Sequence, residues 1–591
     1  MKAVFMVSLL LCSLLWSAPL RNAPTILEQP DGTKYDCFMT GDEYYHRAHD
    51  ANGFTIIKDL ATDWNVYAQK QGPDLTPTTF IPGRDDPAAR GLTPHLLPDE
   101  SILRQRFQNW RGSNRDEYGR APTIGTIENL VIFIRFAGET EFGQPLQLYN
   151  DMHNSLSQAS MRGYFLEESS GQLTVNSSFY PLSAGSMVFS WQDVNPRNYY
   201  YPQSAGNPIG YPPGPPTDPD QNGFIRLHTM MVNAVNAIAP MIPPNLNIDV
   251  DNNFKVDNLS FVCRGNADAT STIFWPHYWV MDAYPVTPLA YIPYMGILRQ
   301  ADDYNFSLQY PDPLYVGYGG GIDAAEISHE FSHTLGFPDL YHYTWDGVNP
   351  CGYWDLMDYC YQVPQHHLAY MKWKYGGWFA APNPLPAAGT SCTLTAVGTN
   401  PFDHYMHQMP TGEQIWIEYR QAVGMYETRV PGSGLIIYRV DQSLFPWGNA
   451  GGPPDEVYVY RPNVAPGWPD GNINTAHYAW DNGHTAINMF TDPAPFSQSM
   501  PGFIDPQFSI HSVGSALMTG PVMPFVVGTV TPNIWTGVMD TNWFNSGNWS
   551  LGAVPVSTDF VIVAWSAMNI CNIPLTPPGM QAVCQDLRVE A

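Results

Sequence analysis

Basic residues are scarce in this chain. Of its 591 residues, 27 are lysine or arginine and 54 are aspartate or glutamate, so the formal net charge is −27 at pH 7. Because proteins that bind nucleic acids need clustered lysine and arginine to neutralise phosphates, this composition argues against a nucleic acid as a partner. The acidic excess instead favours a soluble exported protein, or one in which some carboxylates bind Ca²⁺.

Long apolar runs are missing after the first residues. The run from Ala3 to Trp16 follows a single lysine and precedes small residues and prolines. This is the layout of a secretory signal peptide, and the run is short for a membrane span. We therefore expect a signal peptide over residues 1–23, no integral membrane segment in the mature chain, and a secreted or cell-surface protein.

The sequence also lacks a CxxC motif, which argues against a zinc site built from thiolates. It has eight cysteines, with Cys12 in the apolar run and seven after it. Export permits disulfides, and an odd number leaves one cysteine unpaired. We predict the two pairs that lie closest in sequence, which are Cys351 with Cys360 and Cys571 with Cys584.

Apolar patterning divides the rest of the chain into four parts. Residues 24–112 contain short alternating segments and then a polar, proline-rich run. From 113 to 385 strand-like and helix-like segments alternate, beginning with the nearly continuous apolar run 129–136, which predicts an α/β (α+β) core. Residues 386–528 have strand-like segments between Gly- and Pro-rich loops, which predicts a β-rich domain. The Trp- and Asn-rich residues 529–591 predict a small β module, either complete or truncated.

The clearest helix signal is the segment GGGIDAAEISHEFSHTLGF, residues 319–337. Asp323 suits the first turn of a helix, and Gly336 suits its end. Between them, apolar residues recur at spacings of three and four, which gives one apolar stripe along the helix. These apolar residues are Ala324, Ile327, Phe331 and Leu335.

This helix carries a candidate metal site. Residues four apart lie on one helix face, so His329 and His333 can bind the same ion. Glu330 is about 100° round the helix from His329. There it can accept a proton from a metal-activated water and pass it to a leaving amine. Two imidazoles on one helix favour zinc as the metal.

The predicted third ligand is Asp339. Gly336 allows the helix to end and the chain to reverse, and a carboxylate oxygen binds zinc about as closely as an imidazole nitrogen does. Two rivals remain open: His342, which we expect to face solvent, and Glu418 in the predicted strand IWIEYR. Asp339 could instead hold one of the two histidine rings in place without binding the metal itself.

The pattern HExxHxxGxxD, followed by GYWDLMDYC, resembles the metzincin metallopeptidases. More closely, the chain is similar to the M6 family of secreted bacterial peptidases, of the immune inhibitor A type. The resemblance runs from about Cys37 to Asp441. The stretches that carry it, besides these two motifs, are GDEYYHRAHDANGFTII, SSGQLTV, VDNLSF, IFWPHYW and PGSGLIIYRVD.

This resemblance implies a broad-specificity, zinc-dependent endopeptidase that acts on proteins or peptides and is made as a zymogen. Residues 113–385 would form a metzincin-like catalytic domain, with Met357 in a Met-turn under the metal and Tyr359 donating to the oxyanion. Residues 24–112 would be a pro-domain that inhibits the enzyme within the same chain. Its blocking group could be Cys37 or a carboxylate of GDEYYH, or Cys37 could be purely structural.

The acidic excess has a local counterpart in DVDNNFKVD, residues 249–257. Its oxygen groups resemble an EF-hand-like calcium cage, although Phe254 stands where such a loop prefers glycine. A second candidate is DPDQNG, with Asp218, Asp220 and Asn222; both could equally be solvated turns. The ligands predicted for the first cage are Asp249, Asp251, Asn253, the carbonyl of Lys255, and Asp257.

Two other functions remain as alternatives. One is a catalytically weak or inactive homologue that only binds, and the other is a surface adhesin carried by the Trp-rich end. An inactive homologue would normally have lost Glu330 or a ligand, and an adhesin needs no metal-binding helix. Intact motifs therefore favour the peptidase.

Overall fold

The computed structural model describes most of the chain in two compact units. Unit 1 holds residues up to 381 together with 422–431 and 446–452, and unit 2 holds the remainder. The predicted signal segment falls outside the described residues except at its end, where β1 begins. The glycines 319–321 and the predicted domain boundary at 112 also lie outside the described residues. The described residues are 20–42, 45–111, 121–215, 218–265, 273–284, 286–309, 322–462, 471–517, 520–529, 531–557, 559–563, 567–572, 582, 584 and 586–589.

Unit 1 begins with an antiparallel meander of six strands, followed by helix α1 (Glu100–Arg111). Cys37 lies in the core of this meander with Leu27 and Tyr67. Burial raises the pKa of the Cys37 thiol to about 12, which favours a structural role for this cysteine. The strands are β1 (Leu20–Glu28), β2 (Lys34–Gly41), β3 (His46–His49), β4 (Thr55–Lys58), β5 (Asn65–Gln71) and β6 (Asp74–Pro77).

The second sheet of unit 1 has the order β11-β14-β10-β7-β8, with β9 also paired to β7. All neighbours are parallel except the edge strand β11, which is antiparallel to β14. The apolar run 129–136 forms most of β7. The strands are β7 (Gly125–Arg135), β8 (Leu173–Tyr180), β9 (Trp191–Gln192), β10 (Leu259–Cys263), β11 (His277–Val280) and β14 (Asp303–Leu308).

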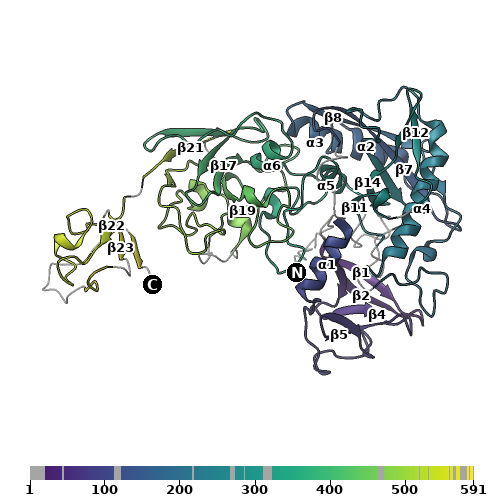
Figure 1. The fold of residues 1–591 in the computed structure, drawn as a ribbon, viewed down its shortest axis with the longest axis horizontal. Helices are drawn as coiled ribbons and strands as arrows, with labels where there is room; N and C mark the ends of the chain where they lie inside the picture. The colour runs from purple at the N-terminus through teal and green to yellow at the C-terminus, as the bar shows by residue number, and fades with distance from the viewer. Residues whose placement is uncertain are drawn as a thin grey trace, which may run out of the picture. The chain divides into compact units, whose positions relative to one another are not determined.

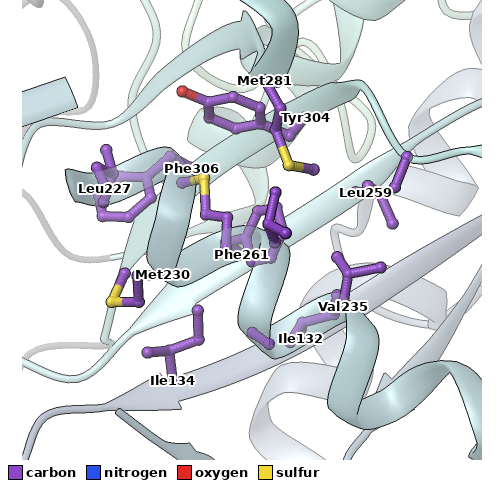
Figure 2. Packing of buried hydrophobic residues seen from close by; sticks show 14 of the residues in the cluster. Ile132, Ile134, Leu227, Met230, Val235, Leu259, Phe261, Met281, Tyr304 and Phe306 are labelled. Atoms are coloured by element: carbon purple, nitrogen blue, oxygen red, sulfur yellow. The ribbon is translucent and has the colours of Figure 1, made fainter. Parts of the chain in front are cut away.

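Helices cover both faces of this sheet (Figure 1). Alternate residues of β7 point to opposite faces, so Ile132 and Ile134 pack with α4 (Gln221–Ile238), while Phe133 packs edge-on against Tyr149 of α2. Figure 2 shows the first of these layers. The other face carries α2 (Leu146–Asn154), α3 (Met161–Glu168) and α5 (Ala324–Thr334), and the unit also contains α6 (Ala369–Lys374) and the hairpin β12 (Tyr291–Tyr294) and β13 (Ile297–Gln300).

Unit 2 is β-rich among its described residues. Two sheets have the orders β16-β17-β18-β19 and β15-β21-β20, and a parallel sheet, β22-β23-β24, packs with Trp535, Trp543 and Trp549. The strands are β15 (Ser391–Thr395), β16 (His404–Gln408), β17 (Gln414–Arg420), β18 (Gly434–Val440), β19 (Val457–Val459), β20 (Ile510–His511), β21 (Val522–Val527), β22 (Asn533–Trp535), β23 (Phe560–Val563) and β24 (Asp586–Val589).

The fold class is therefore mixed α/β, with many sheets and few helices. The segments predicted as strands and helices within 113–385 fall in unit 1, although the last four residues of that range belong to unit 2. Two later segments of the chain also belong to unit 1. Over the part of the chain that the structure describes, no helix is both long and apolar enough to span a membrane.

Candidate metal centre

Helix α5 has well-defined ends. At its start, Oδ1 of Asp323 accepts hydrogen bonds from the backbone N–H of Ala325 and Glu326, both at 2.9 Å. At its end, Phe337 N–H donates to Ser332 O and Gly336 N–H donates to His333 O. These two bonds form a Schellman motif, which Gly336 closes with a φ of 94°. The predicted role of Gly336 in ending the helix is confirmed.

Three side-chain atoms converge beyond this helix. Oδ1 of Asp339 lies 3.1 Å from Nε2 of His329 and 3.4 Å from Nε2 of His333. The three residues form one of two acidic or histidine groups among the described residues that could hold a metal ion. The structure thus brings together the three residues that the sequence predicted as ligands.

Hydrogen bonds on the far side of each ring show which nitrogen is available. Nδ1 of His329 lies 3.0 Å from Leu356 O, and Nδ1 of His333 lies 2.8 Å from Phe337 O. A carbonyl only accepts, so each Nδ1 carries a proton, and in a neutral ring Nε2 offers a lone pair. Oδ1 of Asp339 faces the two Nε2 atoms and accepts no hydrogen bond of ordinary geometry from a described residue. When both rings are neutral, three electron-pair donors meet at one point, which is an arrangement that a cation stabilises.

Burial and charge shift the pKa values here in opposite directions. Burial lowers the pKa of His329, but the Asp339 carboxylate and the Cys360 thiol outweigh it and raise that pKa well above its ordinary value. Burial raises the pKa of Asp339, but His333 and His329 hold it below its ordinary range. The cluster therefore attracts positive charge.

Backbone groups around Met357 hold two of the three ligands. Leu356 O orients His329, as described above, and Met357 O accepts a hydrogen bond from Leu340 N–H at 2.9 Å, directly after Asp339. The Met357 side chain is fully buried. Residues 356–357 thus contact the segments that carry His329 and Asp339.

Asp339 is fixed from two further directions. Its Oδ2 accepts a hydrogen bond from the Tyr343 hydroxyl. Asn449 donates from its backbone N–H to Asp339 O at 3.0 Å and from Nδ2 to Leu340 O at 2.9 Å. Asn449 lies in one of the segments that return to unit 1 from far along the chain, so its role could not be read from the motif.

A buried chain of hydrogen bonds also ties α5 to this turn. Ser332 Oγ lies 3.1 Å from His367 Nε2, and His367 Nδ1 lies 3.1 Å from Asp355 Oδ1. The same oxygen accepts a hydrogen bond from Met357 N–H at 2.8 Å. Neither His367 nor Asp355 was predicted from the sequence, in which the adjacent histidines at 366 and 367 were the available signal.

Glu330 lies beside the three donors and is not one of them. Its carboxylate accepts a hydrogen bond from the backbone N–H of Tyr278 on the edge strand β11, while its Oε2 has no partner among the described residues. Burial raises the pKa of Glu330, against the opposing effect of His329 and His333. A carboxyl group with a raised pKa can both take and return a proton near neutral pH.

A second glutamate, Glu326, lies one turn earlier on the same helix and was not singled out from the sequence. Its side chain is completely buried, and neither carboxylate oxygen accepts a hydrogen bond of ordinary geometry from a described residue. Burial, together with the Asp323 carboxylate, raises the pKa of Glu326 well above its usual value. Sequence pattern alone gave no reason to separate it from a solvated helix residue.

Tyr359 and Cys360 follow Met357 on the same turn. The Tyr359 ring packs edge-on against Tyr353, with ring centroids 4.5 Å apart. The Cys360 thiol instead lies close enough to His329 to raise the pKa of that ring. The turn therefore places Cys360, which the sequence analysis had assigned to a disulfide, next to a predicted ligand.

The two predicted disulfides are not formed. Cys360 faces His329, as described above, and the Cys351 N–H donates to Asp358 Oδ2 at 2.6 Å, so local contacts hold the two cysteines in other environments. Cys571 and Cys584 both pack as thiols against the tryptophan cluster of the small parallel sheet. Proximity in sequence was not enough to predict a bond.

The rival third ligands lie elsewhere. His342 is buried, so the expectation that it faces solvent is wrong, and its Nδ1 lies 2.7 Å from Asp346 Oδ2. Glu418 lies on β17 in unit 2, where it pairs with Arg420 and accepts a hydrogen bond from the Tyr438 hydroxyl at 3.0 Å. Neither belongs to the three-residue group.

The second group that could hold an ion is Asp249, Asp251 and Asp257. Backbone N–H groups of the loop donate to all three carboxylates, and burial raises the pKa of Asp257 to about 7. Arg299 forms an ion pair with Asp249, which the sequence did not reveal. Of the other two predicted ligands, Asn253 Oδ1 accepts a hydrogen bond from Lys255 N–H, while the role of the Lys255 carbonyl stays a prediction. The Lys255 ammonium pairs with Asp302.

The alternative loop, DPDQNG, does not assemble into a cage. Asp218 accepts a hydrogen bond from the Tyr284 hydroxyl, and Asp220 accepts one from the Tyr211 hydroxyl at 2.7 Å. Asn222 donates instead to the carbonyl of Pro212 at 3.1 Å. The two aspartates are therefore each hydrogen-bonded to a different tyrosine, while Asn222 uses its amide N–H.

The N-terminal meander contacts the chain on both sides of the site. Asp42 is completely buried and accepts a hydrogen bond from Trp345 Nε1 at 3.1 Å, six residues after Asp339. The His46 ring stacks on Trp275, two residues before β11, at a centroid distance of 4.4 Å. The intervening Glu43 and Tyr44 lie outside the described residues. No protein-family model and no curated protein matches this chain.

Proposed function

We propose that this protein is a secreted, zinc-dependent endopeptidase that hydrolyses protein substrates. The observation that carries the proposal is the convergence of His329, His333 and Asp339 on one space, with both Nδ1 protons held by backbone carbonyls. Two imidazoles and one carboxylate are a donor set that suits zinc and leaves a coordination position open for catalysis. The metzincin-like fold belongs to the same proposal.

Zinc, when bound, supplies Lewis acidity at this position. Glu330 then accepts a proton from the attacking water and later returns it to the leaving amine. Tyr278 N–H holds the Glu330 carboxylate, and β11 offers a strand edge beside it. A peptide substrate can pair along such an edge, which would present its carbonyl to Glu330.

We also propose that the meander formed by β1 to β6 keeps the enzyme latent. Support comes from the contacts of Asp42 with Trp345 and of His46 with Trp275, which flank the site. Glu330 and Asp339 are also almost completely buried in the full chain. Access to substrate would then require this N-terminal part to move or to be removed.

The test compares the full chain with a protein that starts at Arg115. The shortened protein should hydrolyse casein, lose this activity with 1,10-phenanthroline and regain it with added zinc, whereas the full chain should be nearly inactive. Metal analysis should find one zinc per chain in both. Equal activity in both proteins would refute latency alone, and the absence of zinc from both would refute the peptidase.

We further propose that the Asp249, Asp251 and Asp257 cage binds structural calcium. Asp251→Asn should reduce calcium stabilisation of the folded chain, because the Arg299 charge alone does not balance three carboxylates. At about one hundred times its dissociation constant, an ion that binds only the folded state adds about 2.7 kcal/mol. Thermal unfolding with and without CaCl₂ measures this.

The matched control for the calcium test is Asp220→Asn, in the loop that does not form a cage. This variant should respond to calcium as the unmodified chain does. If Asp251→Asn retained the full calcium response, the ion would have to bind elsewhere.

A further inference from the structure

Glu326 lies on the working face of α5. Residues three, four and seven apart share one face of a helix, so Glu326 is aligned with His329, Glu330 and His333. It precedes Glu330 by one turn, which is about 5.4 Å along the helix axis. Its position follows from the helix bounds alone.

Among the described residues, no lysine or arginine pairs with the Glu326 carboxyl group, and the cationic group that lowers its pKa is the His329 ring. Ser307 on β14 lowers the pKa of Glu326, but neither carboxylate oxygen accepts a hydrogen bond of ordinary geometry from a described residue. Arg429 instead lowers the pKa of Asp323. Its guanidinium donates a hydrogen bond to Gln362 Oε1 at 2.6 Å and lies 4.7 Å from the centre of the Tyr361 ring. The nearby carboxylates of Asp323 and Glu330 add further negative charge.

Burial does not separate Glu326 from the reaction site. Glu330 and Asp339 must meet water or metal, yet each is only 1–2 % exposed in the full chain. Glu326 is buried as well, and Glu330 and His329 both act on its pKa, so it lies close to these two residues. A buried polar group without a partner is costly, and an entering cation would remove that cost.

The proposed chemistry defines which substrate residue comes near Glu326. Glu330 returns its proton to the leaving amine, and that nitrogen belongs to the residue immediately after the scissile bond. The side chain of this residue therefore begins beside Glu330. A lysine or arginine side chain is long enough to extend along one helical turn and place its charge at Glu326.

Resting on the function proposed above, we propose that Glu326 is a specificity residue that selects lysine or arginine immediately after the scissile bond. The ammonium or guanidinium would form a charge-assisted hydrogen bond with the Glu326 carboxylate. The hydrocarbon stem of the side chain would cover the turn between Glu326 and Glu330.

The first test uses the full chain after limited proteolysis, with four peptides that differ only in the residue after the scissile bond: lysine, arginine, glutamine or leucine. We expect kcat/KM for lysine and arginine to exceed that for glutamine and leucine by about tenfold to a hundredfold, the range for hydrogen bonds to charged groups. Equal rates for glutamine and lysine, or faster cleavage before leucine, would overturn the proposal.

The second test is Glu326→Gln, with Glu128→Gln on β7 as the control. In Glu326→Gln the lysine-to-leucine ratio of kcat/KM should fall by at least about tenfold, while Glu128→Gln should keep the ratio of the unmodified protein. Zinc content and the affinity for a product peptide with N-terminal lysine are read in parallel. An unchanged ratio in a zinc-loaded Glu326→Gln protein would contradict the assignment.

The two levels of the proposal fail in different ways. If the zinc-loaded protein cleaved all four peptides with no preference, the role of Glu326 would fall and the peptidase would stand. If the unmodified protein bound zinc and cleaved none of them, nor casein, the proposed function would fall together with the specificity. A selective loss of lysine cleavage and of lysine-product binding in Glu326→Gln supports both.

Discussion

A Glu330→Gln variant is expected to keep its zinc and to hydrolyse peptides about 10²- to 10⁴-fold more slowly. Glutamine has the same shape and can still accept a hydrogen bond from Tyr278 N–H, but it cannot take a proton from water. The three donor atoms belong to other side chains, so metal binding is retained. Steady-state hydrolysis of casein and zinc analysis of the same sample measure the two effects.

The conservative control for this experiment is Tyr359→Phe. It removes only a hydroxyl from the same turn, while the ring can still pack against Tyr353, so its loss of activity should be smaller. A Glu330→Gln protein that kept most of its turnover would show that another group transfers the proton.

An Asp339→Ala variant is expected to lose zinc, with a fall in affinity of more than about a hundredfold. It removes the one carboxylate oxygen that faces both Nε2 atoms, whereas the neighbouring Tyr343 holds only the other oxygen. Tyr343→Phe should therefore cost less, about tenfold to a hundredfold, which is the usual range for a partner of a metal ligand. Competition with a chromogenic zinc chelator measures both.

The rival ligands provide the controls. His342→Ala and Glu418→Gln should leave zinc affinity close to that of the unmodified chain, because those side chains pair with Asp346 and with Arg420. Were Glu418→Gln to lose zinc while Asp339→Ala retained it, the third ligand would have been assigned wrongly, although a two-histidine metal site would remain.

The parts of the site that could be predicted are those that one helix encodes. The spacing of His329 and His333, the cap at Asp323 and the ending at Gly336 all depend on residues within a few positions of one another. Hydrophobic period and helix-end chemistry act at that range, so a single sequence contains the information.

The parts that could not be predicted depend on residues far apart in the chain. Leu356 O orients His329 across 27 positions, and Arg299 reaches Asp249 from another hairpin. A disulfide between Cys360 and Cys351 was predicted because the two residues are near in sequence. The environment of the Cys360 thiol depends instead on the approach of the turn to His329. Such contacts follow from tertiary packing, which local patterns do not specify.

The contact of Asn449 with the third ligand has a consequence for how the protein is made. Chains emerge from the ribosome N-terminus first, and domains tend to fold as units during synthesis. Here the loop of Asp339 and Leu340 depends on a residue that lies more than one hundred positions later in the chain, because Asn449 donates hydrogen bonds to the carbonyls of both. The Asp339 loop therefore gains its final support only after strands β15 to β18 of unit 2 have been translated. A nascent chain that stalled at residue 385 would contain every predicted ligand and still leave the Asp339 loop incompletely held.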